Sequence, residues 1–301
     1  MLLTAAFLFG VNGSAIKTVM HTGITGAEIT LYRSLSSTLI AGLVLFATNR
    51  GAFAVQRSEW KWLLLLGIAG VGLMQFSYAN AVANLPVGVA LLMQYTAIII
   101  VPIVSIWLFK KRLSLRVWLA VGLVLSGLVV VSRIWLGGLN SVGLFFGATA
   151  AIATTVYYLV GEHVHKRRDP VSTLFFTMGI SSCLWFTITP WWKFDVGRFA
   201  NAIDLGGNLT GIMAPGWVMF LWLGLMGAFL PLFLTYAALR HLSATSVGLL
   251  STTETIFGFL FAYLWLGEKI DEIQTIGGLL VIAGIVLAQS SRRSSKWQLS
   301  N

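Results

Sequence analysis

The chain has 301 residues, of which 57% are hydrophobic and 10% are charged, and its formal net charge is +10. Soluble domains usually have about a quarter of their residues charged, so this composition excludes an ordinary water-soluble protein. The positive charge could suit nucleic acid, but the basic residues lie between apolar segments, and we expect no nucleic-acid partner. The lone Cys183 excludes an intrachain disulfide and a metal site built from several cysteines.

Apolar segments of about 20 residues, each long enough to cross a bilayer as a helix, recur along the whole chain. The first segment lacks the charged start and clear cleavage site of a signal peptide, so we expect it to remain as a helix. The predicted fold is therefore an all-α integral membrane protein with ten transmembrane helices. In chain order the segments are 2–20, 27–48, 61–83, 86–109, 115–134, 141–161, 171–190, 216–239, 243–266 and 272–290.

The basic residues alternate in density between successive connections. If the N-terminus is cytoplasmic, most of the Lys and Arg residues fall on the cytoplasmic side of the membrane, among them Arg50, Lys110, Arg168 and Arg293. The positive-inside rule then predicts a multi-pass protein of the cell membrane with both termini in the cytoplasm. The same basic residues are expected to contact anionic lipids at the inner face. The long outer connection, 191–215, is expected to rest on the membrane surface.

Two parts of the chain are similar to each other. The segment "LLGIAGVGLMQFSYANA" (65–81) matches "WLGLMGAFLPLFLTYAA" (222–238), and 88–109 then matches 246–267. We therefore predict two repeats, 1–137 with helices 1–5 and 138–301 with helices 6–10 and a short basic tail. Five spans is an odd number, so the second repeat enters the membrane in the opposite orientation. Inverted repeats are typical of secondary transporters, whose substrate site lies near the bilayer midplane.

Three motifs carry a family resemblance. "FLFGVNGSAIK" (7–17), "LYRS" (31–34) and "ETIFGFLFAYLWLGEKI" (254–270) resemble the EamA branch of the drug/metabolite transporter (DMT) superfamily. Thr255 replaces the proline that is usual in the last motif, and Thr96 and Lys110 stand where the first repeat often has acids. The resemblance implies ten helices and a carrier that moves amino acids or other small metabolites, often outward.

Glu254 lies near the middle of its apolar segment, on a small, partly polar face with Ser251 and Gly258. Charged residues at this depth usually face a cavity and are functional, so we expect Glu254 to bind substrate or a proton. A protonated glutamate that holds neighbouring helices is the structural alternative. Lys17 either extends to the interface, or faces the cavity beside Asn12 to attract a carboxylate or pair with an acid.

The segment "QYT" contributes Gln94, Tyr95 and Thr96, and Thr96 matches Glu254 in the repeat. These side chains and Tyr157 are expected to line the cavity. Arg33 is expected to be a buried structural hydrogen-bond hub. Pro102 and Pro231 are candidate hinges, because proline frees a backbone carbonyl and kinks a transmembrane helix.

His163 and His165 do not predict a metal site, because two residues at this spacing point in different directions on a helix. No phosphate-binding loop or catalytic cluster is present, so neither an enzyme nor a bound cofactor is predicted. We expect alternating access in a monomer-sized unit, with 2–20, 86–109, 141–161 and 243–266 around the cavity. A receptor or scaffold, and an uncoupled facilitator or channel, remain the alternatives.

Overall fold

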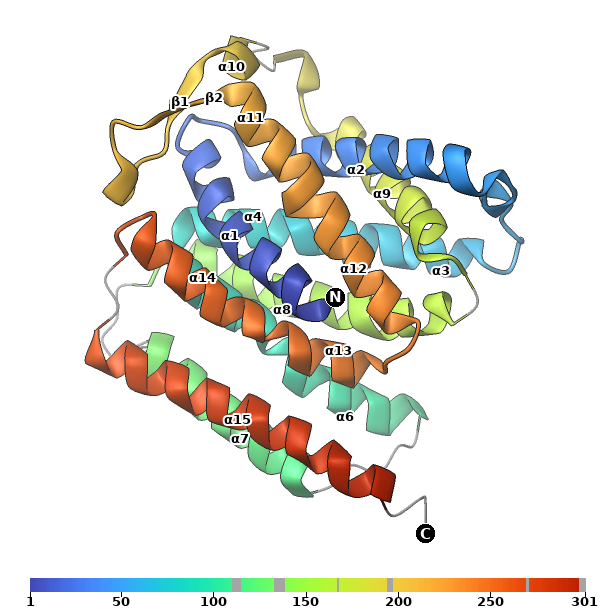
Figure 1. Cartoon of the computed structure of the whole chain (residues 1–301), viewed down its shortest axis with the longest axis vertical. Helices are drawn as coiled ribbons and strands as arrows, with labels where there is room; N and C mark the ends of the chain where they lie inside the picture. The colour runs from blue at the N-terminus through green and yellow to red at the C-terminus, as the bar shows by residue number, and fades with distance from the viewer. Residues whose placement is uncertain (110–114, 133–138, 167, 194–196, 269–270, 298–301) are drawn as a thin grey trace.

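The structure, a computed structural model, describes residues 1–109, 115–132, 139–166, 168–193, 197–268 and 271–297. Most of these residues form helices that lie side by side in a bundle (Figure 1). In lipid, the backbone N–H and C=O groups must bond to each other because no water is present. Apolar segments in such surroundings therefore form helices. The uninterrupted long helices are α1 (Leu2–Met20), α2 (Gly26–Thr48), α7 (Leu115–Ser132), α8 (Ser141–His165), α9 (Pro170–Ile188) and α15 (Glu272–Trp297).

Four further segments are helical but interrupted. Two contain a π-helical stretch: α3 (Trp60–Leu65), η2 (Leu66–Gly72) and α4 (Leu73–Asn84) form one, and α11 (Gly216–Leu221), η6 (Trp222–Phe229) and α12 (Leu230–Leu239) form the other. The other two are interrupted by a turn residue. Thr96 separates α5 (Val87–Tyr95) from α6 (Ala97–Phe109), and Thr252 separates α13 (Ala244–Ser251) from α14 (Thr253–Leu264).

Seven helical stretches among the described residues are long and apolar enough to cross a membrane. Shorter apolar helices cover Val87–Val101, Trp118–Gly127 and Thr275–Gly284. The predicted class, a helical membrane protein, is therefore confirmed. The predicted boundary between residues 137 and 138 lies outside the described residues.

The long connection after α9 contains the clearest departure from the all-α prediction. It forms an antiparallel ribbon of β1 (Ala202–Asp204) and β2 (Met213–Pro215), preceded by α10 (Gly197–Ala200). Gly206, Gly207 and Gly211 have positive φ angles that allow the chain to reverse between the strands. This hairpin loop packs on the ends of α1 and α14 through Leu205, whose carbonyl accepts hydrogen bonds from Thr18 Oγ1 (3.2 Å) and Trp265 Nε1 (2.8 Å).

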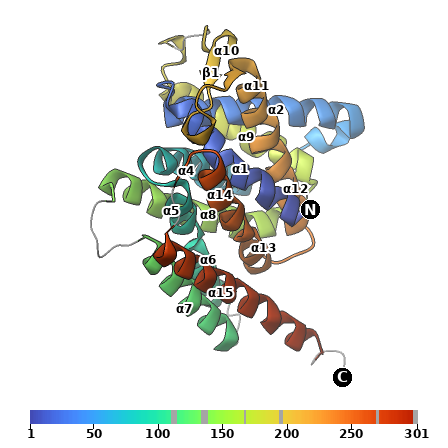
Figure 2. The same cartoon turned by 60° about the vertical axis from the view of Figure 1, so that its left-hand side comes forward.

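The helices of the two halves of the chain are interleaved. α2 packs against α9, α7 packs against α15, and α1 packs against α14 while α4 packs against α8 (Figures 1 and 2). α2 also contacts η6, and α9 contacts η2. The middle of the molecule is consequently surrounded by helices from both halves.

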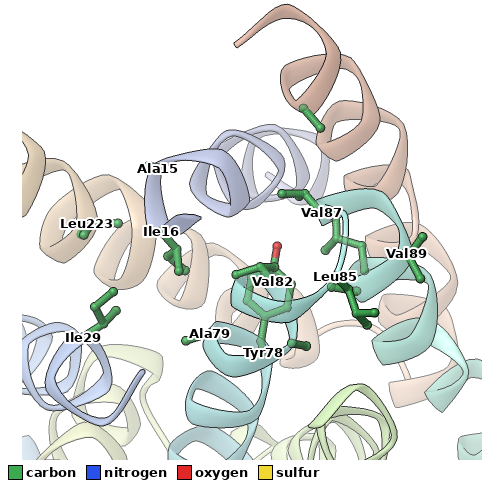
Figure 3. Packing of buried hydrophobic residues seen from close by; sticks show 14 of the residues in the cluster. Ala15, Ile16, Ile29, Tyr78, Ala79, Val82, Leu85, Val87, Val89 and Leu223 are labelled. Atoms are coloured by element: carbon green, nitrogen blue, oxygen red, sulfur yellow. The ribbon is translucent and has the colours of Figure 1, made fainter. Parts of the chain in front are cut away.

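Two clusters of buried apolar residues occupy the two ends of the bundle. The hairpin-side core includes Ile16, Tyr78, Val82, Leu85 and Val87 (Figure 3) and extends to Ile203 of β1. The opposite core is formed by the other ends of the same helices together with α9, α12 and α13; it includes Leu66, Tyr157, Met178, Leu232, Tyr236 and Val247.

Candidate functional site

A cavity lies where the hairpin-side core meets the opposite core. The space inside it that the centres of water molecules can occupy is about 40 Å³, which is room for a few waters. In this conformation the side chains around it leave space for little more than these waters. The lining residues are Phe9, Asn12, Arg33, Met74, Gln75, Tyr78, Gln94, Tyr95, Tyr157, Tyr158, Leu232, Thr235, Ser251 and Glu254.

Most of the residues predicted for a binding site are brought together here. The four segments expected to surround the cavity all contribute: α1 provides Asn12, α5 provides Gln94 and Tyr95, and α8 provides Tyr157. The fourth segment provides Ser251 and Glu254, which lie on either side of the turn at Thr252 and both line the cavity. α2, α4 and α12, which were not among the segments predicted to surround the cavity, contribute as well.

Glu254 is 5% exposed and is held by a residue of the other half of the chain. The Tyr95 hydroxyl donates a hydrogen bond to Glu254 Oε2. Arg33 of α2 lines the same cavity. The cavity therefore contains one acid and one base, both buried, and supplied by helices far apart in the sequence.

Arg33 makes a hydrogen bond to another helix and also lines the cavity. Its Nη2 donates to the carbonyl of Gly227, at 2.6 Å, within the π-helical stretch η6. Gly227 matters for space, because a Cβ atom there would lie 2.2 Å from Asn12 Oδ1. The glycine thus lets α1 approach η6 closely enough for Asn12 to reach the cavity.

Several polar atoms of the lining make no hydrogen bond with any described residue. Buried polar atoms in folded proteins are nearly always bonded to protein or water. A cluster of unpartnered atoms around one cavity indicates a place for water or a polar ligand. The atoms are Asn12 Oδ1, Arg33 Nε, Gln75 Oε1, Tyr78 Oη, Gln94 Oε1 and Tyr157 Oη.

Two predicted site residues lie outside this lining. Lys17 pairs with an acid: its Nζ is 2.6 Å from Glu268 Oε1 and donates to the Leu85 carbonyl at 3.3 Å. The Thr96 hydroxyl bonds to the Met93 carbonyl at 2.7 Å, because Thr96 is the turn residue between α5 and α6. Neither side chain lines the cavity in this structure, and pairing with an acid is one of the arrangements expected of Lys17. The roles of both residues in binding or coupling stay predictions.

The predicted hinges are placed differently. Pro231 is the second residue of α12 and directly follows η6, so it lies at an interruption of the helix. The side chain of Pro102 lies outside the described part of the structure, and α6 continues through this position. The interruption in that segment falls at Thr96, six residues earlier.

The two histidines contact different aromatic rings. The His163 ring lies 4.5 Å from the Trp62 ring, and the His165 ring lies 4.1 Å from that of Tyr236. His165 is fully buried and His163 is exposed, as expected for residues two apart on a helix.

Sequence reasoning missed the contributions of α4 and α12. Gln75 and Tyr78 lie about one turn apart on α4, and Leu232 and Thr235 do so on α12. A signal was available, since these residues fall inside the two matching segments 65–81 and 222–238. Polar residues in such a repeated apolar segment indicate a common inward face.

The chain is similar to known membrane transporters. The sequence profile of the EamA-like transporter family matches residues 1–133 and again 141–289. An uncharacterized transporter of Methanothermobacter thermautotrophicus is 22% identical over 95% of this chain and 84% of its own length. One from Archaeoglobus fulgidus is 24% identical over 88% of each chain. A solved structure described as "Crystal structure of protein" shares the fold, with a TM-score of 0.73, 16% identity and coverage of 97% of this chain and 96% of that one.

Proposed function

The chain belongs to the EamA-like transporter family, and from this membership we propose that it moves amino acids or related amphipathic metabolites across the cell membrane as a secondary transporter. The observation that carries the proposal is the presence of Arg33 and Glu254 in one buried, polar cavity. Charged groups at membrane depth are costly and usually mark a substrate or ion pathway.

The cavity chemistry fits a zwitterion. The Arg33 guanidinium is suited to a carboxylate, because its planar N–H groups bind both oxygens. Glu254 is suited to an ammonium group, and the rings of Tyr95, Tyr157 and Tyr158 offer both apolar contact and cation–π attraction. A substrate with both charges places one opposite Arg33 and the other opposite Glu254. It therefore lowers the free-energy cost of burying these two charged residues in the membrane.

The proposed architecture is ten spans in two inverted repeats. Support comes from the two separate profile matches, 1–133 and 141–289. Further support comes from η2 and η6, since the alignment of Gly67 with Gly224 and of Gly70 with Gly227 superimposes the two π-helical stretches. The contacts of α2 with η6 and of α9 with η2 are those expected for halves related by a two-fold axis. Alternating access then follows from rocking of the halves about the cavity.

The proposed topology has both termini in the cytoplasm and the hairpin loop outside. α1 begins and α15 ends on the side of the bundle away from the hairpin loop (Figure 1), as an even number of crossings requires. Arg50 and Arg57 lie in the connection between α2 and α3, and Arg240 lies between α12 and α13, so under this topology these described basic residues face the cytoplasm, in accordance with the positive-inside rule. We propose outward transport, and one chain is sufficient because it supplies the whole cavity lining.

Glu254 also supports proton coupling. Its carboxylate accepts a hydrogen bond from Tyr95 and can hold either a proton or a cationic substrate group, so the two compete for it. Competition of this kind couples the flow of one to the flow of the other. An uncoupled facilitator lacks such competition.

Transport of labelled amino acids by the purified protein in liposomes tests the proposal. Saturable uptake that is stimulated by substrate on the other side of the membrane is expected of a carrier. Flux without saturation indicates a channel, and no flux of amino acids or related metabolites indicates a receptor or scaffold. Arg33→Gln is expected to abolish saturable uptake while leaving the protein in the membrane.

The coupling role is tested by Glu254→Gln, which preserves size and hydrogen bonding but removes titration. We expect this variant to exchange substrate across the membrane yet to lose the pH dependence of net transport. Glu28→Gln, in the capping box at the start of α2, is the control and is expected to behave as wild type. A wild-type pH profile in Glu254→Gln would contradict coupling through this residue.

A further inference from the structure

We propose that Lys17 and Glu268 form the gate that closes the cavity toward the hairpin loop, and that α5 links this gate to Glu254. The proposal rests on the alternating access proposed above. Lys17 belongs to α1, and Glu268 follows the end of α14, so the gate joins the two halves of the chain.

The two side chains hold three helices at one point. Glu268 Oε1 lies 2.6 Å from Lys17 Nζ, and Glu268 Oε2 accepts a hydrogen bond from the backbone N–H of Val87 at 3.1 Å. Val87 is the first residue of α5, where the helix dipole favours a negative charge. Lys17 also binds the carbonyl of Leu85, just before α5. The start of α5 is thus bound from both sides.

The Lys17–Glu268 pair lies next to the cavity, on the side of the hairpin loop. Lys17 is one helical turn beyond Gly13, and a Cβ atom on Gly13 would lie 2.5 Å from Tyr78 Oη and 2.7 Å from Val87 Cγ1. Tyr78 lines the cavity, and with Val87 and Leu85 it belongs to the hairpin-side core (Figure 3). A single apolar layer therefore separates the cavity from the ion pair. The side chains of the pair are 20% and 22% exposed, so the pair marks the edge of the closed layer.

Both ends of α5 are hydrogen-bonded to the segment 253–268. At its start, Val87 is bonded to Glu268, and at its last residue, Tyr95 is bonded to Glu254. A substrate or proton that binds Glu254 breaks its hydrogen bond with Tyr95. The hydrogen bond that remains, between Val87 and Glu268, is part of the gate. Occupancy of the cavity is therefore communicated to the gate along one helix of nine residues.

The opposite end of the molecule has a related contact. Glu162 of α8 accepts a hydrogen bond at 2.7 Å from the N–H of Ala244, the first residue of α13. The repeat pairs the start of α13 with the start of α5, and it pairs α8 with α1. A carboxylate thus holds the first residue of an interrupted helix at each end, as expected if each end closes in turn.

Thiol labelling from one side of the membrane tests the gate. Ser251→Cys in a Cys183→Ser background places a single thiol in the cavity, and a membrane-impermeant reagent is applied to intact cells or to inverted vesicles. Lys17→Met and Glu268→Gln are each expected to raise labelling from the hairpin side by about tenfold, the effect of losing one charged hydrogen bond. Lys166→Met is the control, since it breaks the exposed Lys166–Glu162 pair at the other end.

Glu268→Gln decides the matter if Lys17→Met fails to insert, because glutamine retains an oxygen for the Val87 N–H. Unchanged hairpin-side labelling in the inserted variants would overturn the gate. Labelling requires no transported solute, so a failed transport assay would overturn the proposed function and leave the gate result standing.

Discussion

The two ends of the bundle are held together by different sets of contacts. At the hairpin end, one partly buried ion pair between side chains, 20% and 22% exposed, lies over an apolar layer. At the opposite end, Arg168 binds the connection between α2 and α3: it pairs with Glu59 at 2.8 Å and donates to the carbonyls of Ala52 and Ala54. A single, partly exposed pair separates at less cost than a guanidinium that is 7% exposed and is also held by two backbone carbonyls. The comparison indicates that the hairpin end is the one that opens more easily.

The largest expected effect is on stability at the opposite end. Arg168→Ala leaves Glu59 and the Ala54 carbonyl without their partner, while the Ala52 carbonyl keeps its hydrogen bond from Ser172 Oγ at 2.6 Å. Each buried acceptor left unsatisfied costs about 1–3 kcal/mol, and a charged one costs more. We expect a large fall in the thermal midpoint of the purified protein in detergent. Lys17→Met, at the hairpin end, is the matched variant and is expected to cost at most about 1 kcal/mol. Equal losses in the two variants would remove the distinction between the ends.

The second expected effect compares two glycines that the repeat pairs. Gly227→Ala places a Cβ 2.2 Å from Asn12 Oδ1, while Gly70→Ala meets the flexible end of Leu66 at 2.9 Å. Overpacking of a tight contact costs about 1–3 kcal/mol, so Gly227→Ala is expected to lower both stability and substrate affinity. Gly70→Ala is expected to affect neither strongly. Binding measured by transport competition, beside thermal unfolding, separates the two positions, and equal effects would refute the comparison.

A smaller effect is expected from Glu162→Ala. The variant removes the acceptor for the Ala244 N–H and also the ion pair with Lys166. Labelling of the cavity thiol should rise by a few-fold from the side opposite the hairpin loop, mainly through the lost backbone hydrogen bond. The rate from the hairpin side should not rise. An increase from the hairpin side instead would mean that Glu162 does not act on its own end of the cavity.

The smallest effect is confined to the hairpin loop and depends on pH. Asp204 is exposed, and hydrogen bonds from the N–H groups of Gly206 and Gly211 hold the pKa of its carboxyl below its usual value. A lowered pKa in the folded loop means that the stabilisation is present above the unfolded pKa and is lost as pH falls through the folded pKa. The protection factors of the loop amides, which correct for the slower intrinsic exchange in acid, should therefore fall as the pH is lowered. Asp204→Asn should remove that pH dependence, and an unchanged dependence would contradict it.

The class of fold was predictable because membrane burial leaves a strong compositional signal. The site was partly predictable, since an isolated carboxylate such as Glu254 is costly in an apolar segment and so stands out. Lys17 could not be placed, because its partner Glu268 is 251 residues away in the sequence. For the same reason the proximity of Arg33 to Glu254 was not apparent from either segment alone.

The hairpin loop was missed for a different reason. Its strands have three residues each and lie in a glycine-rich stretch, so they present no alternating pattern. What orders them is the Asp204 carboxylate and the positive φ angles of the glycines, together with docking on Trp265. These are contacts of the folded chain, and local sequence gives little sign of them.

The π-helical stretches have a consequence for helical register. A π-helical turn contains one residue more than an α-helical turn, so everything that follows it is rotated by about 100° relative to a continuous α-helix. Gln75 and Tyr78 follow η2, and Leu232 and Thr235 follow η6. Deleting one residue from either stretch would turn those side chains away from the cavity without changing any of them. Part of the cavity's composition is therefore encoded in the spacing of residues that do not line it.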